Sequence, residues 1–169
     1  MGKKIELIVA RDSNWGIGLN GKIPWRCRDD LLHFRDVTTL TKDPTKRNAV
    51  IMGRVTWDSL NNKPLAGREN ICVSRSPQTI ATCSGLDKAI EYANDHPDIE
   101  KIFIIGGCKV YREALEELPI QKIYMTVIKQ EFPCDRFVRF IRSHLNNYMN
   151  KSLTYETPDY AFWEYSSRG

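Results

Sequence analysis

The chain has 169 residues, and its 25 Lys and Arg residues exceed its 21 Asp and Glu residues, for a net charge of +4. Hydrophobic residues make up 41% and charged residues 27%, which is typical of a globular protein. This length predicts one domain over residues 1–169, and no stretch approaches the ~20 apolar residues of a membrane helix. Residues 1–75 carry 14 bases and 8 acids, but no long basic run predicts a nucleic-acid or membrane partner.

The cysteines argue against a metal-binding or disulfide-linked protein. No two of them lie closer than 11 residues, so the CxxC pairs of zinc and thioredoxin sites are absent. The first ten residues do not have the long apolar stretch of a signal peptide. We therefore expect a reduced, cytoplasmic monomer that binds a small molecule and no metal.

Short, β-branched apolar runs alternate with helical patterns along the chain. The runs are typical of strands that a sheet buries on both faces, and they lie at 5–10, 48–52, 69–74, 101–105 and 122–128. Helices are predicted between them, at 29–39, 54–61, 86–94 and 109–118. Residues 152–167 are aromatic and alternate in polarity, as an antiparallel pair of strands would. The pattern predicts an α/β fold with a mostly parallel central sheet and an antiparallel C-terminal edge.

The first glycine-rich segment, Gly16–Gly21, matches the spacing GxGxxG. A dinucleotide-binding fingerprint also requires a helix to begin at the last glycine. Here Lys22, Ile23 and Pro24 follow, and proline disfavours helical geometry in the residue before it. The segment is therefore predicted to be a long loop that covers a site, rather than a Rossmann turn.

The second candidate is a carboxylate on an apolar helical stripe. Asp30 shares one face of the helix predicted at 29–39 with Phe34 and Val37. Removal from water would raise the pKa of this group, so that it could move a proton or bind a cationic heterocycle. The alternative for Asp30 is capping of the helix amides, the role expected of Asp29.

Glycines and arginines at the ends of strands form the third candidate. Gly106 and Gly107 join an apolar strand to a helix, where a ligand can approach the backbone and an anion can meet the helix N-terminus. The alternative is a purely structural tight turn. Arg54 and Arg75 follow predicted strands and Arg68 lies in the loop at 64–68, near the edge where open α/β sheets bind ligands, although each could simply be solvated.

Together, these motifs resemble those of the dihydrofolate reductase family in order and spacing. The resemblance rests on Ile8–Ala10, Trp15–Gly18, Ile23–Trp25, Asp30–Leu31 with Phe34, Val50–Arg54 with Thr56, Trp57, Ser59 and Leu60, Pro64–Asn70, Val73–Arg75, Ile105–Gly107 with Val110–Tyr111, and Thr126. It implies a single-domain fold with helices on both faces of the sheet. It also implies NADPH-dependent reduction of 7,8-dihydrofolate to tetrahydrofolate, which supplies one-carbon metabolism.

The resemblance also implies the residues of the folate site. Asp30 would bind the pterin and promote protonation of its N5 atom, with a hydrogen bond from Thr126, and Trp25 would complete the catalytic group. Arg68 would pair with the α-carboxylate of the glutamate moiety. The implied substrate-binding residues are Ile8, Asp30, Leu31, Phe34, Arg35, Leu60, Leu65, Arg68, Ile105 and Thr126.

For NADPH, the resemblance implies that the loop after the first strand closes on the nicotinamide and that the glycine pair, joined by a cis peptide, receives the pyrophosphate. The implied cofactor-binding residues are Ala10, Gly16, Ile17, Gly18, Leu19, Asn20, Gly21, Lys22, Gly53, Arg54, Val55, Thr56, Val73, Ser74, Arg75, Ile105, Gly106, Gly107, Cys108, Lys109, Val110 and Tyr111.

Some residues depart from the family pattern. Val55 replaces a basic residue near the cofactor phosphate, and Asp135-Arg136-Phe137 resembles a family loop motif but lacks its proline. One alternative is a pyrimidine reductase of riboflavin synthesis, which has no use for Asp30 and Arg68. Another is a non-catalytic nucleotide-binding module, which needs no acid on an apolar stripe.

Overall fold

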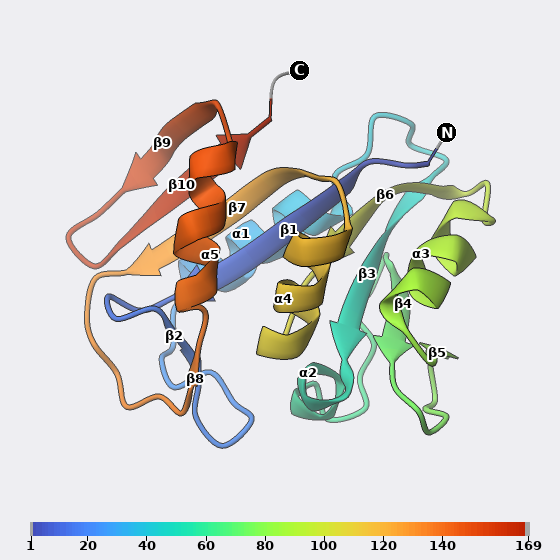
Figure 1. The fold of residues 1–169 in the computed structure, drawn as a ribbon, viewed down its shortest axis with the longest axis horizontal. Coiled ribbons are helices and arrows are strands. Elements are labelled where there is room, and N and C mark those ends of the chain that lie inside the picture. Colours follow the sequence, from blue (N-terminus) through green and yellow to red (C-terminus); the bar gives the residue numbers. More distant parts are fainter. Residues whose placement is uncertain (1, 168–169) are drawn as a thin grey trace.

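The computed structural model describes residues 2–167 and contains one large twisted sheet (Figure 1). Eight strands are paired in the order β5-β4-β3-β6-β1-β7-β10-β9. Their bounds are β1 Ile5–Arg11, β3 Arg47–Gly53, β4 Glu69–Val73, β5 Ala81–Cys83, β6 Ile99–Ile104, β7 Ile120–Ile128, β9 Asn150–Glu156 and β10 Tyr160–Ser166. A separate small ladder joins β2 Gly16–Gly18 to β8 Arg136–Phe137.

The helices are α1 Arg28–Thr39, α2 Arg54–Ser59, α3 Leu86–Asn94, α4 Cys108–Glu117 and α5 Arg139–His144, followed by a 3₁₀ turn, η1, at Leu145–Asn147. α1 and α2 pack on one face of the sheet, over a cluster that includes Val50, Phe103 and Trp57. α3, α4 and α5 cover the other face, where Ile51 and Ile104 lie (Figure 1). The expectation of helices on both faces is confirmed.

Strand directions follow the predicted class. β1 pairs in parallel with β6 and β7, and β3 pairs in parallel with β4 and β6. β10 runs antiparallel to both β7 and β9, which makes the antiparallel C-terminal edge. The central strands are buried on both faces, which explains why their sequences are nearly continuously apolar instead of alternating.

Differences from the sequence predictions lie in short or irregular elements. The predicted helix 54–61 ends at Ser59 because Asn61 and Asn62 adopt positive φ angles of 54° and 59°. β5 was not predicted, since its three residues are only partly buried and carry no apolar run. α5 and the β2–β8 ladder were also not predicted. No helix begins at Gly21, and α1 starts only at Arg28, which agrees with the exclusion of a Rossmann turn.

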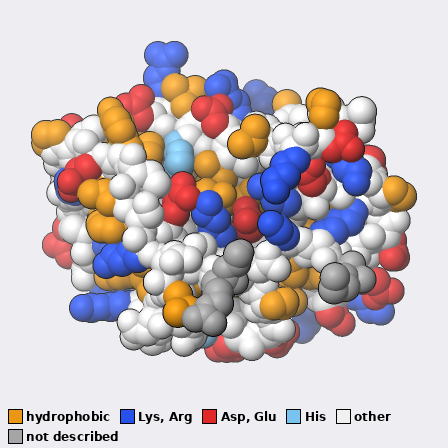
Figure 2. Space-filling view, turned by 90° about the horizontal axis from the view of Figure 1, so that it is seen from above, with side chains coloured by type: hydrophobic (Ala, Val, Ile, Leu, Met, Phe, Trp, Pro, Cys, Tyr) orange, Lys and Arg blue, Asp and Glu red, His pale blue; other side chains and the backbone are white. Residues whose placement is uncertain are grey.

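The surface matches the modest net charge. On the face seen in Figure 2, basic and acidic side chains are intermingled and apolar side chains are scattered between them. Within residues 2–167, no helix has the length and apolar character needed to cross a membrane.

Candidate functional site

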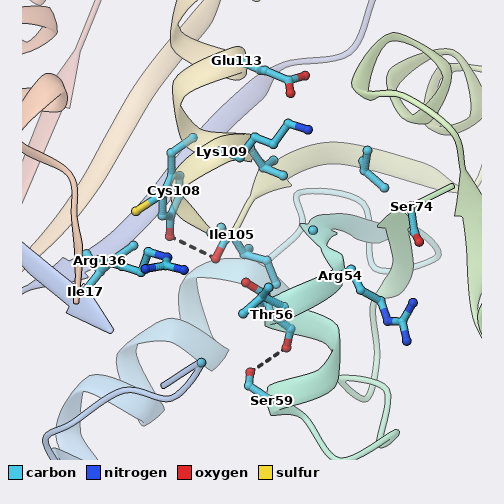
Figure 3. A pocket seen from close by; sticks show the side chains of 18 of the residues that line it. Ile17, Arg54, Thr56, Ser59, Ser74, Ile105, Cys108, Lys109, Glu113 and Arg136 are labelled. Carbon is cyan, nitrogen blue, oxygen red and sulfur yellow. Dashed lines mark hydrogen bonds between the residues drawn. The ribbon is translucent and has the colours of Figure 1, made fainter. Parts of the chain in front are cut away.

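A cavity of about 840 Å³ opens at the carboxyl ends of the parallel strands (Figure 3). Ala10 at the end of β1, Gly53 at the end of β3 and Val73 at the end of β4 contribute to its wall. Ligands of open α/β sheets bind at this edge. The volume lies within the roughly 300–1,000 Å³ of small-molecule sites.

The glycine pair forms the central wall of the cavity. Gly106 and Gly107 are joined by a cis peptide, and Gly106 has a φ of 122°. A Cβ atom on Gly106 would lie 3.3 Å from the ring of Tyr111, and one on Gly53 would lie 3.1 Å from Val110. The close approach of these segments lets α4 begin at Cys108 with its first amides at the cavity, where they can bind an anion.

Hydroxyl and guanidinium groups line the cavity beside α2. Thr56 and Arg54 lie in the first turn of α2, and Ser74 follows β4 (Figure 3). The Arg54 guanidinium donates through Nη1 to Ser76 Oγ at 3.0 Å and through Nε to Asp58 Oδ1 at 3.0 Å. This arrangement suits an anionic group such as a phosphate.

The loop after β1 is folded as a tight hairpin. Leu19 and Lys22 exchange two backbone hydrogen bonds of 2.7 and 3.0 Å. Asn20 and Gly21 between them have φ angles of 51° and 79°, which a type I′ turn requires and the pair Asn-Gly favours. The hairpin presents Ile17, Gly21 and Lys22 to the cavity.

Asp12 anchors this loop, and its role was not predicted. Its fully buried carboxylate accepts hydrogen bonds from the amides of Asn14 and Gly16 through Oδ1, at 2.9 and 2.7 Å. Oδ2 accepts from the amide of Phe132 at 2.8 Å. One carboxylate therefore joins the start of the loop to a segment 120 residues further along the chain.

Most of the predicted cofactor-binding residues line the cavity, but four of the loop residues do not. Gly16, Gly18, Leu19 and Asn20 form the hairpin without contributing to the cavity wall. The prediction missed several lining residues, namely Ile23, Ser59, Ser76, Ser84, Gly85, Glu113 and Arg136. Helical spacing from Thr56 and from Lys109 could have found Ser59 and Glu113, whereas Arg136 carries no local signal.

Asp30 is held by a hydrogen bond from the sheet. Thr126, buried on β7, donates through Oγ1 to Asp30 Oδ1 at 2.7 Å. Burial raises the pKa of the Asp30 carboxyl, against smaller lowering effects of the Thr126 hydrogen bond and the nearby His33. Asp30 is therefore not a helix cap, and it has the raised pKa that the apolar stripe predicted.

The first-turn acid Asp29 also has a different partner from the one expected. It accepts a hydrogen bond from the hydroxyl of Tyr160 on β10 rather than from helix amides. Trp25 is 7% exposed and packs in the same region, against Ile128 and Phe162. These contacts fix the start of α1 to the antiparallel edge of the sheet.

Tyr111, in the cavity wall, connects β1 to the residue that follows β6. Its hydroxyl lies 2.7 Å from the carbonyl oxygen of Ile8 and 3.0 Å from that of Ile105, and it donates to them. Burial raises the pKa of this phenol, so it remains a neutral donor. The two carbonyls are thereby held close together, between the cavity and Asp30.

Arg68 is unusually buried for an arginine, with 9% of its surface exposed. Nε donates to the Ala66 carbonyl at 3.0 Å and Nη1 to Thr38 Oγ1 at 3.0 Å. Burial, followed by the nearby charge of Arg35, lowers the pKa of Arg68. Within residues 2–167 no carboxylate pairs with it, which leaves guanidinium donors for a ligand.

The other predicted substrate contacts lie near α1. Phe34, Leu60 and Leu65 pack partly against the cluster under this helix, while Leu31 is 65% exposed. Arg35 is exposed and pairs with Asp36 at 3.1 Å. The structure thus brings an acid, an apolar surface and a buried arginine together along one helix.

Comparison with known proteins assigns the family. The family model described as dihydrofolate reductase matches residues 4–165. The chain belongs to this family. Dihydrofolate reductases are oxidoreductases, and the matched range includes the acid on α1, the glycine turn and the buried arginine.

Similar members of the dihydrofolate reductase family come from insects and plants. The dihydrofolate reductase of Heliothis virescens is 41% identical over 144 residues, covering 79% of this chain and 78% of that protein. That of Drosophila melanogaster is 38% identical over 142 residues and covers 79% of this chain. The bifunctional dihydrofolate reductase-thymidylate synthase of Daucus carota is 40% identical, and the match spans 28% of that longer protein.

Proposed function

We propose that this protein reduces 7,8-dihydrofolate to 5,6,7,8-tetrahydrofolate with NADPH. The observation that carries the proposal is the half-buried Asp30 carboxylate, which is bound by Thr126 and lies near Tyr111, a residue of the wall of a cavity that also holds a helix N-terminus. A binding module would gain nothing from placing an ionisable group there, since burial of an acid costs free energy.

Asp30 binds the pterin and promotes its protonation. Its pKa is raised by burial, so it holds a proton closer to neutral pH than an exposed aspartate does. The bond from Thr126 orients the carboxylate toward the amidine edge of the ring. The carbonyls of Ile8 and Ile105, held by Tyr111, accept hydrogen bonds from an exocyclic amino group of the same ring.

The glutamate end of the substrate binds at Arg68. Burial makes this guanidinium a poorly hydrated cation with donors that Thr38 and Ala66 leave free. Such a planar fork suits a carboxylate. A pyrimidine reductase substrate has no glutamate, so Arg68 favours a folate over that alternative.

The residues of the cavity fit NADPH. Gly53, Gly106 and Gly107 leave room that Cβ atoms would fill, and the first amides of α4 suit a pyrophosphate. Arg54, Arg75 and the nearby hydroxyl groups suit the 2′-phosphate. When bound, NADPH supplies the hydride, and the protein orients it and excludes water. The hairpin at 16–22 covers the reacting end.

The test is the loss of absorbance at about 340 nm when dihydrofolate is added to protein and NADPH, with Asp30→Asn as the main variant. We expect the variant to lose roughly 100-fold or more in kcat at neutral pH, because proton transfer contributes about 10² to 10⁴. The deficit should shrink at low pH, where the substrate arrives protonated.

Asp36→Asn is the matched control, because Asp36 lies on the same helix and pairs only with exposed Arg35. Burial raises the pKa of Asp30 above its ordinary value of 3.8, so the ionised carboxylate lowers the stability of the fold at pH values above that ordinary pKa. Asp30→Asn removes this charge and therefore should not lower the thermal midpoint at neutral pH. A rate like that of the unmodified protein would contradict the role of Asp30. Tight NADPH binding with no turnover by the unmodified protein would instead indicate a binding module.

A further inference from the structure

Arg136 is a cation in the cavity wall that is not among the cofactor-binding residues implied by the family resemblance. It lies on β8, and Figure 3 shows its side chain beside Cys108 and Ile17. The segment has no helical or strand pattern that would place it at the site. Only the pairing of β8 with β2 brings it there.

Several hydrogen bonds fix this position. The amide of Asp135 donates to the Gly18 carbonyl at 2.8 Å, and the Asp135 carboxylate accepts from the amide of Asn20 at 3.0 Å. The amide of Val138 donates to the Trp15 carbonyl at 2.8 Å. The position of Arg136 is therefore fixed by hydrogen bonds between β8 and the hairpin that follows β1.

The charge of Arg136 is not used within the protein. Its one hydrogen bond is from Nη1 to the neighbouring Asp135 carbonyl, at 3.0 Å. Among residues 2–167, no carboxylate lies within ion-pair distance of its guanidinium. Most of its donors remain open, and Cys108, the first residue of α4, lies beside it in the cavity wall (Figure 3). A cation facing a helix N-terminus calls for an anion between them.

We propose that Arg136 binds the cofactor phosphate on the nicotinamide side of the pyrophosphate, which rests on the proposed use of NADPH. The residues beside Arg136 indicate which of the cofactor phosphates it binds. Arg136 lies beside Ile17 and Cys108, next to the hairpin, whereas Ser74 lies on the other side of the cavity (Figure 3). A guanidinium can bind two phosphate oxygens at once.

This contact makes cofactor binding and hairpin position interdependent. Phosphate binding at Arg136 should favour the β2–β8 pairing, because this pairing places Arg136 at the cavity. The paired hairpin in turn raises cofactor affinity by the same factor, since coupling between two equilibria is reciprocal.

The test measures direct binding by calorimetry, without folate and independently of turnover. Arg136→Gln should weaken NADPH binding by about three- to tenfold, a modest loss because the side chain is exposed. Arg136→Lys should recover part of the loss. Binding of adenosine 2′,5′-bisphosphate, which lacks the nicotinamide-side phosphate, should not change in either variant.

Arg139→Gln is the matched control. Arg139 lies three residues along the chain and stacks over the Phe137 ring at 4.1 Å, and it does not line the cavity. It should bind NADPH as the unmodified protein does. The affinity of the unmodified protein should also fall more steeply between about 0.05 and 0.3 M salt than that of Arg136→Gln.

Equal NADPH affinity in the unmodified protein and Arg136→Gln would overturn the inference, as would an equal loss in Arg139→Gln. A parallel loss of adenosine 2′,5′-bisphosphate binding would overturn the assignment of the phosphate. Failure of the unmodified protein to bind NADPH would refute the proposed function and the role of Arg136 with it. Reduced NADPH affinity with normal dihydrofolate turnover at saturating NADPH would support both.

Discussion

The two sides of the cleft hold their charged groups in different ways. Beside α1, Asp30 and Arg68 are partly or fully buried, and each has one or two specific hydrogen-bond partners. Beside α4, the cavity is formed by glycine backbone and by exposed cations such as Arg75 and Arg136. A buried charge depends on few partners, so the loss of one is costly. Exposed charges are screened by water, and each contributes only a small part of the binding free energy. Single side-chain changes should therefore be most costly beside α1.

After Asp30→Asn, the largest effect in this comparison is expected for Arg68→Ala. Loss of a charge-assisted contact should raise the KM for dihydrofolate by roughly 10- to 100-fold, with a smaller change in kcat. Steady-state rates measure it, and a pterin without the glutamate moiety serves as control substrate. An equal loss for both substrates would contradict a contact with the glutamate.

On the α4 side, the sensitive element should be the backbone. Gly106→Ala combines a φ of 122° with a Cβ placed 3.3 Å from Tyr111, and should destabilise the fold by about 1–3 kcal/mol and weaken NADPH binding. Gly67→Ala is the matched control, because Gly67 also has a positive φ, 76°, but open space around it. Thermal unfolding with and without NADPH separates them. If backbone strain were the only cause, Gly106→Ala and Gly67→Ala would have equal thermal midpoints both with and without NADPH.

A moderate effect is expected for Thr126→Val. Removal of one neutral donor should lower kcat/KM by about fivefold. The Thr126 bond lowers the pKa of Asp30, so its loss should raise that pKa further and move the fall in rate to higher pH. A pH–rate profile measures this shift. A lower rate with an unchanged profile would mean that Thr126 acts only through packing.

The smallest effect is expected for Arg75→Ala, on the exposed side of the cavity. We expect a rise of about three- to fivefold in the KM for NADPH and little change for NADH, because only NADPH carries the 2′-phosphate. Equal losses with the two cofactors would exclude Arg75 as the group that distinguishes them.

The class of fold and the positions where chemistry is possible could be predicted from the amino-acid sequence alone. Continuous apolar runs such as 48–52 predicted buried parallel strands, since burial on both faces leaves no polar positions. Helical spacing placed Asp30 with Phe34 and Val37, and the structure packs Phe34 and Val37 on the core under α1. These inferences succeeded because each depends on residues within a few positions of one another.

The partners of these groups depend on how distant segments of the chain pack together. The Asp12 carboxylate binds Phe132, and Arg136 reaches the cavity through the pairing of β8 with Gly18. No sequence pattern near Asp12 or Arg136 predicts these contacts. Both contacts form between segments that lie more than 100 residues apart in the chain. Local periodicity records whether a side chain is buried, whereas the identity of its neighbours is a property of the folded chain.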